Sequence, residues 1–192
     1  MVFNDVSIDY RYTQYSSKEG IMHTGEARVL GSDQGSAGQL GSIGVRFMID
    51  SADSGGTFSL VEHPVPPRKL AAPLHRHSRE DEYTFVLEGE VGVLLGDEVV
   101  FGGPGDLIFK PRAQWHTFWN AGATPARVLE IISPGGFEGY FEQLSDLLAT
   151  AGSPPDPVKV GAIADRFGLE LDPTSIPRLT AEHGLTFGRD AA

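Results

Sequence analysis

The stretch PLHRHSREDEYTFVLEGE, residues 73–90, carries the most informative pattern in the chain. His75 and His77 are two residues apart, so on a β-strand both imidazoles would lie on one face. Glu82 is seven residues past His75, an odd offset that would place it on the opposite face of an unbroken strand. We therefore expect the polar run 78–81 to form a turn that resets the register. The run 83–87 that follows is rich in strand-forming residues.

A second stretch, GDLIFKPRAQWHTFWN at residues 105–120, places His116 in another aromatic, β-prone run. Three imidazoles and one carboxylate suit a divalent transition metal such as Fe, Mn, Ni, Cu or Zn. The chain has no cysteine, which leaves histidines and carboxylates as metal ligands. The predicted ligands are His75, His77, Glu82 and His116. The alternative is that these are polar strand residues satisfied by hydrogen bonds.

The first stretch resembles the first cupin motif, G(x)5HxH(x)3–4E(x)6G, and the second resembles the second cupin motif, G(x)5PxG(x)2H(x)3N. Both motifs are present in order, ending at Gly89 and Asn120 respectively. Two positions depart from the pattern, because Lys69 and Ala113 stand where the motifs usually have glycine. The resemblance covers roughly residues 40–135 and implies an all-β cupin double-stranded β-helix, or jelly-roll barrel.

Several short strands with frequent turn signals also favour an all-β sandwich or barrel. We expect an N-terminal extension or arm at 1–39, a cupin barrel at 40–135, and a C-terminal helical extension at 136–192 packed on the barrel. Apolar residues repeat at helical spacing over 137–148, and a second helix is expected from Pro157 to about 167. The first helix would be either a lid over the barrel mouth or, as we favour, a cap on the outside of a sheet. The remainder reads as irregular.

The formal net charge of −11 argues against nucleic acid and against anionic membranes as partners. No apolar run approaches the roughly 18 residues that a spanning helix needs. The N-terminus shows neither the basic nor the apolar region of a secretory signal. The absence of cysteine, and so of disulfides, suits a cytoplasmic protein.

Strand alternation predicts which side chains surround the metal. Glu82 and Val86 would share the inner face of one strand, and His116 and Phe118 the inner face of another. Val86 and Phe118 are therefore candidate pocket residues, although core filling is the simpler role for Phe118. Glu82 is also a candidate catalytic residue, because it could leave the metal and act as a general base. Gly89, Gly105, Pro111 and Asn120 are expected to serve turns and strand ends.

A metal with vacant coordination positions could bind water, substrate or dioxygen there, as in an open catalytic site. The resemblance to the quercetin dioxygenase-like group of small, single-barrel cupins implies a metal-dependent dioxygenase acting on a small aromatic or enolisable compound. A non-catalytic small-molecule binder and a metal-dependent isomerase remain open alternatives. The family's habit implies a homodimer, for which the aromatics expected to point outward would supply the apolar surface. These are Tyr83, Phe85, Trp115 and Trp119, and the alternative is that some of them pack between the sheets or under the helices.

Overall fold

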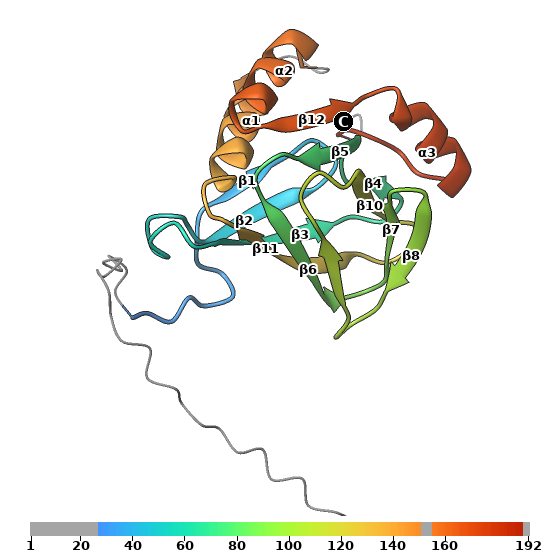
Figure 1. Ribbon diagram of the computed structural model, residues 1–192. Helices are drawn as coiled ribbons and strands as arrows, with labels where there is room; N and C mark the ends of the chain where they lie inside the picture. Colours follow the sequence, from blue (N-terminus) through green and yellow to red (C-terminus); the bar gives the residue numbers. More distant parts are fainter. Residues whose placement is uncertain (1–26, 151–154, 190–192) are drawn as a thin grey trace, which may run out of the picture.

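The computed structural model describes residues 27–150 and 155–189. They form two antiparallel six-stranded sheets that close into a barrel, with helices packed against it (Figure 1). Most of the arm expected at 1–39 lies outside the described residues. One sheet has the order β1-β2-β3-β11-β6-β9, and the other has β12-β5-β10-β7-β8 with β4 beside β10. The strands are β1 (Ala37–Gln39), β2 (Gly44–Ile49), β3 (Ser59–Val65), β4 (Lys69–Leu70), β5 (Leu74–His77), β6 (Asp81–Glu88), β7 (Val91–Leu95), β8 (Glu98–Gly102), β9 (Leu107–Lys110), β10 (His116–Asn120), β11 (Ala126–Ser133) and β12 (Leu169–Asp172). This confirms the predicted double-stranded β-helix.

The expected break between His77 and Glu82 is a passage from one sheet to the other. Strand β5 ends at His77 and belongs to the second sheet, while β6 begins at Asp81 and belongs to the first. The odd offset is therefore no obstacle, because the two ligand-bearing strands face each other across the barrel. Alternation along β6 is as predicted, since Glu82 is buried and Phe85 is exposed.

The barrel interior is filled from both sheets. Its central cluster includes Val86 of β6, Val93 of β7, Phe118 of β10 and Val128 of β11. These positions share the inward phase of their strands, so the period-2 pattern explains the core directly. Burial of this apolar surface supplies the main driving force for closing the barrel.

The C-terminal region is more ordered than the sequence suggested. Helices α1 (Glu138–Thr150) and α2 (Pro157–Arg166) are where they were expected. The stretch expected to be irregular instead forms β12 and a third helix, α3 (Ser175–His183). Pro177 fits α3 because it falls in the first turn, where a missing N–H is tolerated. None of the described helices has the length and apolar character needed to cross a membrane, and the cytoplasmic location stays a prediction.

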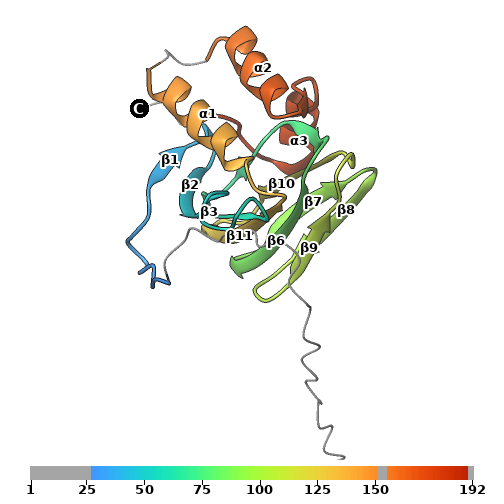
Figure 2. The same ribbon diagram turned by 60° about the vertical axis from the view of Figure 1, so that its left-hand side comes forward.

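Helix α1 lies over the open end of the barrel, and Figure 2 shows α1 and α2 together at that end. Tyr140 and Phe141 of α1 belong to one apolar cluster with Phe137, which directly precedes the helix. The same cluster contains Val61 of β3 and Ile132 of β11, whose side chains point into the barrel. The lid placement is therefore the one observed, and the outer-face cap that we favoured is wrong. The reason is that the apolar stripe of α1 covers inward-facing side chains at the barrel rim.

Helix α3 covers the outer face of the second sheet. Trp119 was expected to point outward, either onto a dimer surface or under a helix, and it is fully buried. Its ring stacks on His183 with 4.2 Å between centroids, and it packs with Leu179 and Leu185. Trp119 is thus unavailable for dimerisation, because the unrecognised third helix occupies that face.

Candidate metal centre

Three strands bring the four predicted ligands together. Strand β5 carries His75 and His77, β6 carries Glu82, and β10 carries His116. His116 pairs directly with His75 across the antiparallel β10–β5 ladder. One donor atom from each of the four residues can be chosen so that all lie within 4.8 Å of one another, and all four residues are buried. The two sequence motifs therefore converge on one site.

Backbone carbonyls fix the orientation of two of the imidazoles. Nδ1 of His75 lies 2.8 Å from the carbonyl oxygen of Pro73, and Nδ1 of His116 lies 2.9 Å from that of Gln114. A carbonyl can only accept, so each ring carries its proton on Nδ1 and presents the Nε2 lone pair to the centre. Burial lowers the pKa of His75 well below its ordinary value, with His116 and His77 adding to the effect. Burial also lowers the pKa of His116.

Glu82 lies between the imidazoles and a buried lysine. Its Oε2 is 3.0 Å from Nε2 of His116 and 2.8 Å from Nζ of Lys110, and its Oε1 is 3.3 Å from Nε2 of His77. Burial would raise the pKa of Glu82, but Lys110, His77 and His116 outweigh burial and hold it well below its usual range. The carboxylate is therefore ionised and held from two sides.

Lys110 is itself held by a second carboxylate, that of Glu130. Nζ of Lys110 lies 2.8 Å from Oε1 of Glu130, and the hydroxyl of Thr84 donates to the same oxygen at 2.9 Å. Burial and the charge of Glu82 raise the pKa of Glu130 to about 7, although Lys110 opposes the shift. Burial would lower the pKa of Lys110, but Glu130 and Glu82 keep it raised. The lysine is thus a permanent cation beside the site.

The residues fit a divalent transition metal. His116 is neutral and already donates through Nδ1, so its Nε2 lone pair faces a carboxylate oxygen at 3.0 Å. Nε2 of His77 is buried and has no hydrogen-bond partner among the described residues. A cation between these groups would explain both the close approach of two acceptors, Nε2 of His116 and Oε2 of Glu82, and the unpaired Nε2 of His77. Adjacent donor atoms held about 2.1 Å from a metal would stand roughly 3 Å apart, and the oxygens of Glu82 lie 3.0 Å and 3.3 Å from Nε2 of His116 and His77.

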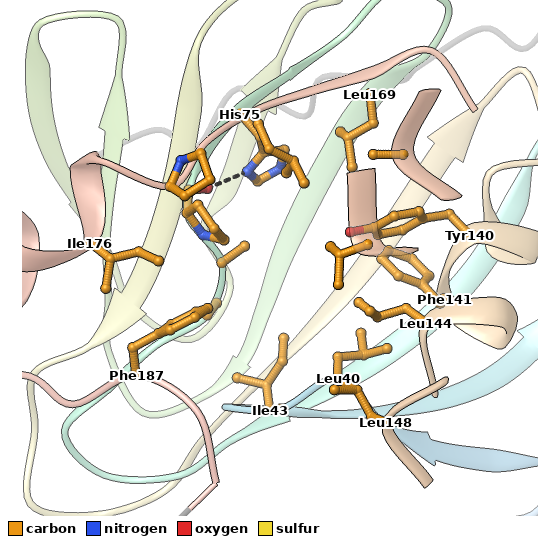
Figure 3. A pocket seen from close by; sticks show the side chains of 18 of the residues that line it. Leu40, Ile43, His75, Tyr140, Phe141, Leu144, Leu148, Leu169, Ile176 and Phe187 are labelled. Atoms are coloured by element: carbon orange, nitrogen blue, oxygen red, sulfur yellow. Dashed lines mark hydrogen bonds between the residues drawn. The ribbon is translucent and has the colours of Figure 1, made fainter. Parts of the chain in front are cut away.

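The site opens into a cavity of about 850 Å³ between the barrel and its helical lid. His75, Glu82, Lys110 and Glu130 form the polar end. Figure 3 shows His75 on one side and apolar side chains around the rest of the space. The apolar wall includes Leu40, Ile43, Tyr140, Phe141, Leu144 and Phe187. A compound that enters would therefore meet polar groups at one end and hydrocarbon elsewhere.

The two candidate pocket residues lie in different places. Phe118 lines the cavity, with its ring centroid 5.4 Å from Nζ of Lys110. Val86 is not among the lining residues. It packs in the barrel core with Ile108 and Val128, so its placement in the pocket is corrected. The reason is depth: Val86 shares the inward phase of Glu82 but lies further down the strand.

Sequence reasoning missed Lys110 and Glu130. Leu107 and Phe109 on β9 look like core residues, yet they are exposed, and Ile108 and Lys110 point inward. A clearer signal was available for Glu130, because it shares the inward phase of Val128 and Ile132 in β11. Two arginines near the motifs, Arg46 and Arg112, pair with Glu62 and Asp81 and do not line the cavity.

Comparison with known proteins agrees with this geometry. Residues 62–132 match the cupin domain family, a segment that contains all four ligands. The match covers the segment of the chain that carries the site, and the barrel has the cupin fold. The likeness of the cupin barrel to KdgF from a Halomonas species shows the same fold, with a TM-score of 0.51, 16% identity, and coverage of 59% of this chain and 99% of that one.

Two further relatives come from Streptomyces. The tetracenomycin polyketide synthase protein TcmJ of Streptomyces glaucescens is 29% identical over 89 residues, which are 46% of this chain. The cupin-containing chain spans 60% of the length of that curated relative. The polyketide cyclase RemF of Streptomyces resistomycificus is 32% identical, with a TM-score of 0.44 and coverage of 48% of this chain and 65% of that one.

Proposed function

We propose that this protein is a metal-dependent enzyme of the dioxygenase type that acts on an aromatic or enolisable compound. The observation that carries the proposal is a buried cluster of three histidines and one glutamate at the polar end of a largely apolar cavity. Related sets of two histidines and one carboxylate serve non-haem iron oxygenases. The ligands proposed are His75, His77, Glu82 and His116, with one divalent Fe, Mn, Ni, Cu or Zn ion.

When bound, the metal would supply Lewis-acid polarisation of a substrate oxygen and, for a redox-active metal, electron exchange with dioxygen. The chain's own residues position and shield the substrate. The apolar wall from α1 and the 40–43 segment would hold a ring system, and the lid would exclude water. Phe118 lies beside Lys110 at the polar end and would contact the reacting end of the substrate.

Proton handling in this site favours Glu130 over Glu82. Glu82 faces two imidazoles and is ion-paired with Lys110, so leaving the metal to act as a base would break that ion pair. Glu130 lines the cavity, is not in the ligand set, and has a pKa of about 7. A group near neutrality suits exchange of a proton at an enol or phenol oxygen. We assign Glu82 the role of ligand and Glu130 that of proton acceptor.

The cavity volume constrains the substrate. About 850 Å³ lies toward the upper end of the roughly 300–1,000 Å³ range of small-molecule sites, which is more than a single ring needs. The similarity to TcmJ, whose name places it with a polyketide synthase, supports a polyketide-type compound. Such compounds combine several rings or β-diketone units with enolic or phenolic oxygens. Their chemistry fits a cavity with one polar end.

A second candidate function uses the same ligand without oxygen. The TcmJ similarity is compatible with a protein that binds or rearranges a polyketide-type compound, including the non-catalytic binder and the isomerase considered from sequence. In that case Lys110 and the metal would stabilise an enolate, and no oxidation would follow. Oxygen consumption therefore separates the two candidates.

The experiment is oxygen-electrode measurement on protein loaded separately with Fe, Mn, Ni, Cu or Zn, with flavonols and enolic diketones as substrates. Product mass is measured in parallel. We expect oxygen uptake that matches product formation with a redox-active metal, and loss of uptake in Glu130→Gln with metal content unchanged. Rearranged product of unchanged mass without oxygen uptake would contradict the dioxygenase proposal and favour the second candidate.

The protein is also proposed to form a homodimer through the outer face of β6 and β9. Tyr83 and Phe109 stack there with 5.0 Å between ring centroids, and Phe85 pairs with Leu107. Phe109 and Leu107 are about half exposed although they are large and apolar. Strand β9 is at the end of its sheet. A second copy that covers this edge would bury the patch.

A further inference from the structure

Glu80 has no place in either cupin motif, yet it is buried within the ligand segment. It lies between His77 and Glu82 in the β5–β6 connection and is 6% exposed. Its Oε2 has no hydrogen-bond partner among the described residues. A carboxylate in such a position is costly to bury unless a donor satisfies it. The structure therefore calls for a donor beside Glu80.

That donor is within reach on His77. Nδ1 of His77 faces Oε2 of Glu80 at 3.6 Å, and Nδ1 is also buried and unpaired among the described residues. The other faces of the ring are taken by aromatic contacts, with Phe137 at 4.3 Å and His116 stacked at 5.5 Å between centroids. Glu80 is thus the acceptor positioned for the His77 Nδ1–H.

The three ligand histidines show why this acceptor matters. His75 and His116 donate Nδ1–H to backbone carbonyls, which turns each Nε2 lone pair toward the centre. Among the described residues no carbonyl accepts from Nδ1 of His77, and a neutral imidazole carries a single N–H. A carboxylate at Nδ1 would select the same tautomer and make Nε2 more electron-rich.

We infer that Glu80 is a positioning residue that orients His77 and sets its tautomer for metal binding. The inference rests on the metal site of the proposed function. Closing the 3.6 Å gap to hydrogen-bond length takes a movement of well under 1 Å, about the scale of a side-chain adjustment. The proposed acceptor for His77 is a side chain, so it can be removed by substitution. The acceptors for His75 and His116 are backbone carbonyls, which substitution does not remove.

The test is Zn²⁺ affinity, measured by competition with a chromophoric chelator, in wild type, Glu80→Leu and Glu80→Gln. We expect Glu80→Leu to lose about 10–100-fold in affinity, the range for removing an outer partner of a ligand histidine. Glu80→Gln keeps an acceptor oxygen and should lose less. Glu90→Gln removes the same charge from an exposed turn and should bind as wild type does.

Two readouts separate positioning from a general structural role. In ¹⁵N NMR of the Zn²⁺-loaded protein, His77 should be protonated on Nδ1 in wild type, with that signal shifted in Glu80→Leu. Metal-free Glu80→Leu should remain folded by circular dichroism although it leaves the His77 Nδ1–H without its acceptor, so its lower Zn²⁺ affinity would not come from unfolding. Equal Zn²⁺ affinity and an unchanged His77 signal would overturn the inference while the proposed metal site stands. Wild type that binds no Zn²⁺ would overturn both.

Discussion

Nζ of Lys110 lies 2.8 Å from Oε1 of Glu130, and both side chains are buried inside the barrel. Because Lys110 also pairs with Glu82, its loss would leave two buried carboxylates without a cation. Breaking a buried pair from one side typically removes about 3–5 kcal/mol of stability. We expect Lys110→Met to lose that amount in urea denaturation of metal-free protein at pH 7.

The double variant Lys110→Met/Glu130→Leu supplies the control for this loss. It removes one carboxylate together with the lysine, so it should be more stable than the single variant. The ion pair between Arg112 and Asp81 at the surface offers a second control. Arg112→Met should lower the free energy of unfolding by less than about 1 kcal/mol. A double variant no more stable than Lys110→Met would contradict the view that unpaired charge causes the loss.

Ala113 adopts a left-handed conformation, with φ of 64°, in the turn before His116. A left-handed backbone costs a residue with a Cβ about 1–2 kcal/mol, and replacement by glycine removes this cost. Glycine also makes the unfolded chain more flexible, which offsets part of the gain. Ala113→Gly should therefore raise the free energy of unfolding by about 1 kcal/mol. Thermal or urea unfolding measures this, with Ala123→Gly as a control at a position without positive φ. Destabilisation by Ala113→Gly would show that this conformation carries no strain.

His63 should make the protein less stable in mild acid. Burial lowers its pKa to about 4, while its Nδ1 lies 2.9 Å from the carbonyl oxygen of Gly44. The unfolded chain takes up the proton near pH 6.5, so the stabilisation is complete above 6.5 and is lost as the pH falls toward 4. Between pH 7 and 5 we expect metal-free wild type to lose about 2 kcal/mol more than His63→Gln.

The pH comparison is made by urea denaturation of both proteins at the two pH values with a chelator present. Other titrating groups are common to both proteins and cancel in the difference. An equal pH dependence would mean that folding does not lower the pKa of His63.

The proposed dimer depends on the exposed aromatic face of β6 and β9. Phe109→Lys places a charge beside Tyr83 on this face, so we expect it to halve the mass measured by light scattering after size-exclusion chromatography. Val158→Lys, at an exposed apolar residue of α2, is the matched control and should leave the mass unchanged. A wild-type protein that is monomeric at high concentration would refute the proposal.

The sequence predicted the barrel and the ligand set because both rest on short-range spacing. The HxH pair, Glu82 and His116 are fixed by strand periodicity and by motif, and the structure brings them together. Lys110 and Glu130 escaped notice because a charged residue in a strand is usually exposed. Each of the two charges can be buried only because the other is beside it. They lie on β9 and β11, which flank β6 in the sheet, and neither segment alone reveals that arrangement.

The C-terminal region shows a different limit. Apolar and polar residues alternate over only four positions in the segment 169–172, which is too short to predict a strand. The segment forms β12 because it pairs with the edge of β5, with Leu171 opposite His75. Helix α3 is short and contains a proline, yet Leu179 is buried against Trp119. Tertiary contacts therefore decide both elements, and they also convert α1 from an expected outer cap into a lid.

Metal content tests the account most directly. Protein purified without added metal, and then after reconstitution, is analysed for elements alongside His75→Ala/His116→Ala and His183→Gln. We predict about one equivalent of a divalent transition metal in wild type and in His183→Gln, and none in the double variant. Wild type without metal after reconstitution, or a double variant with undiminished metal, would contradict the assignment of these residues as a metal centre.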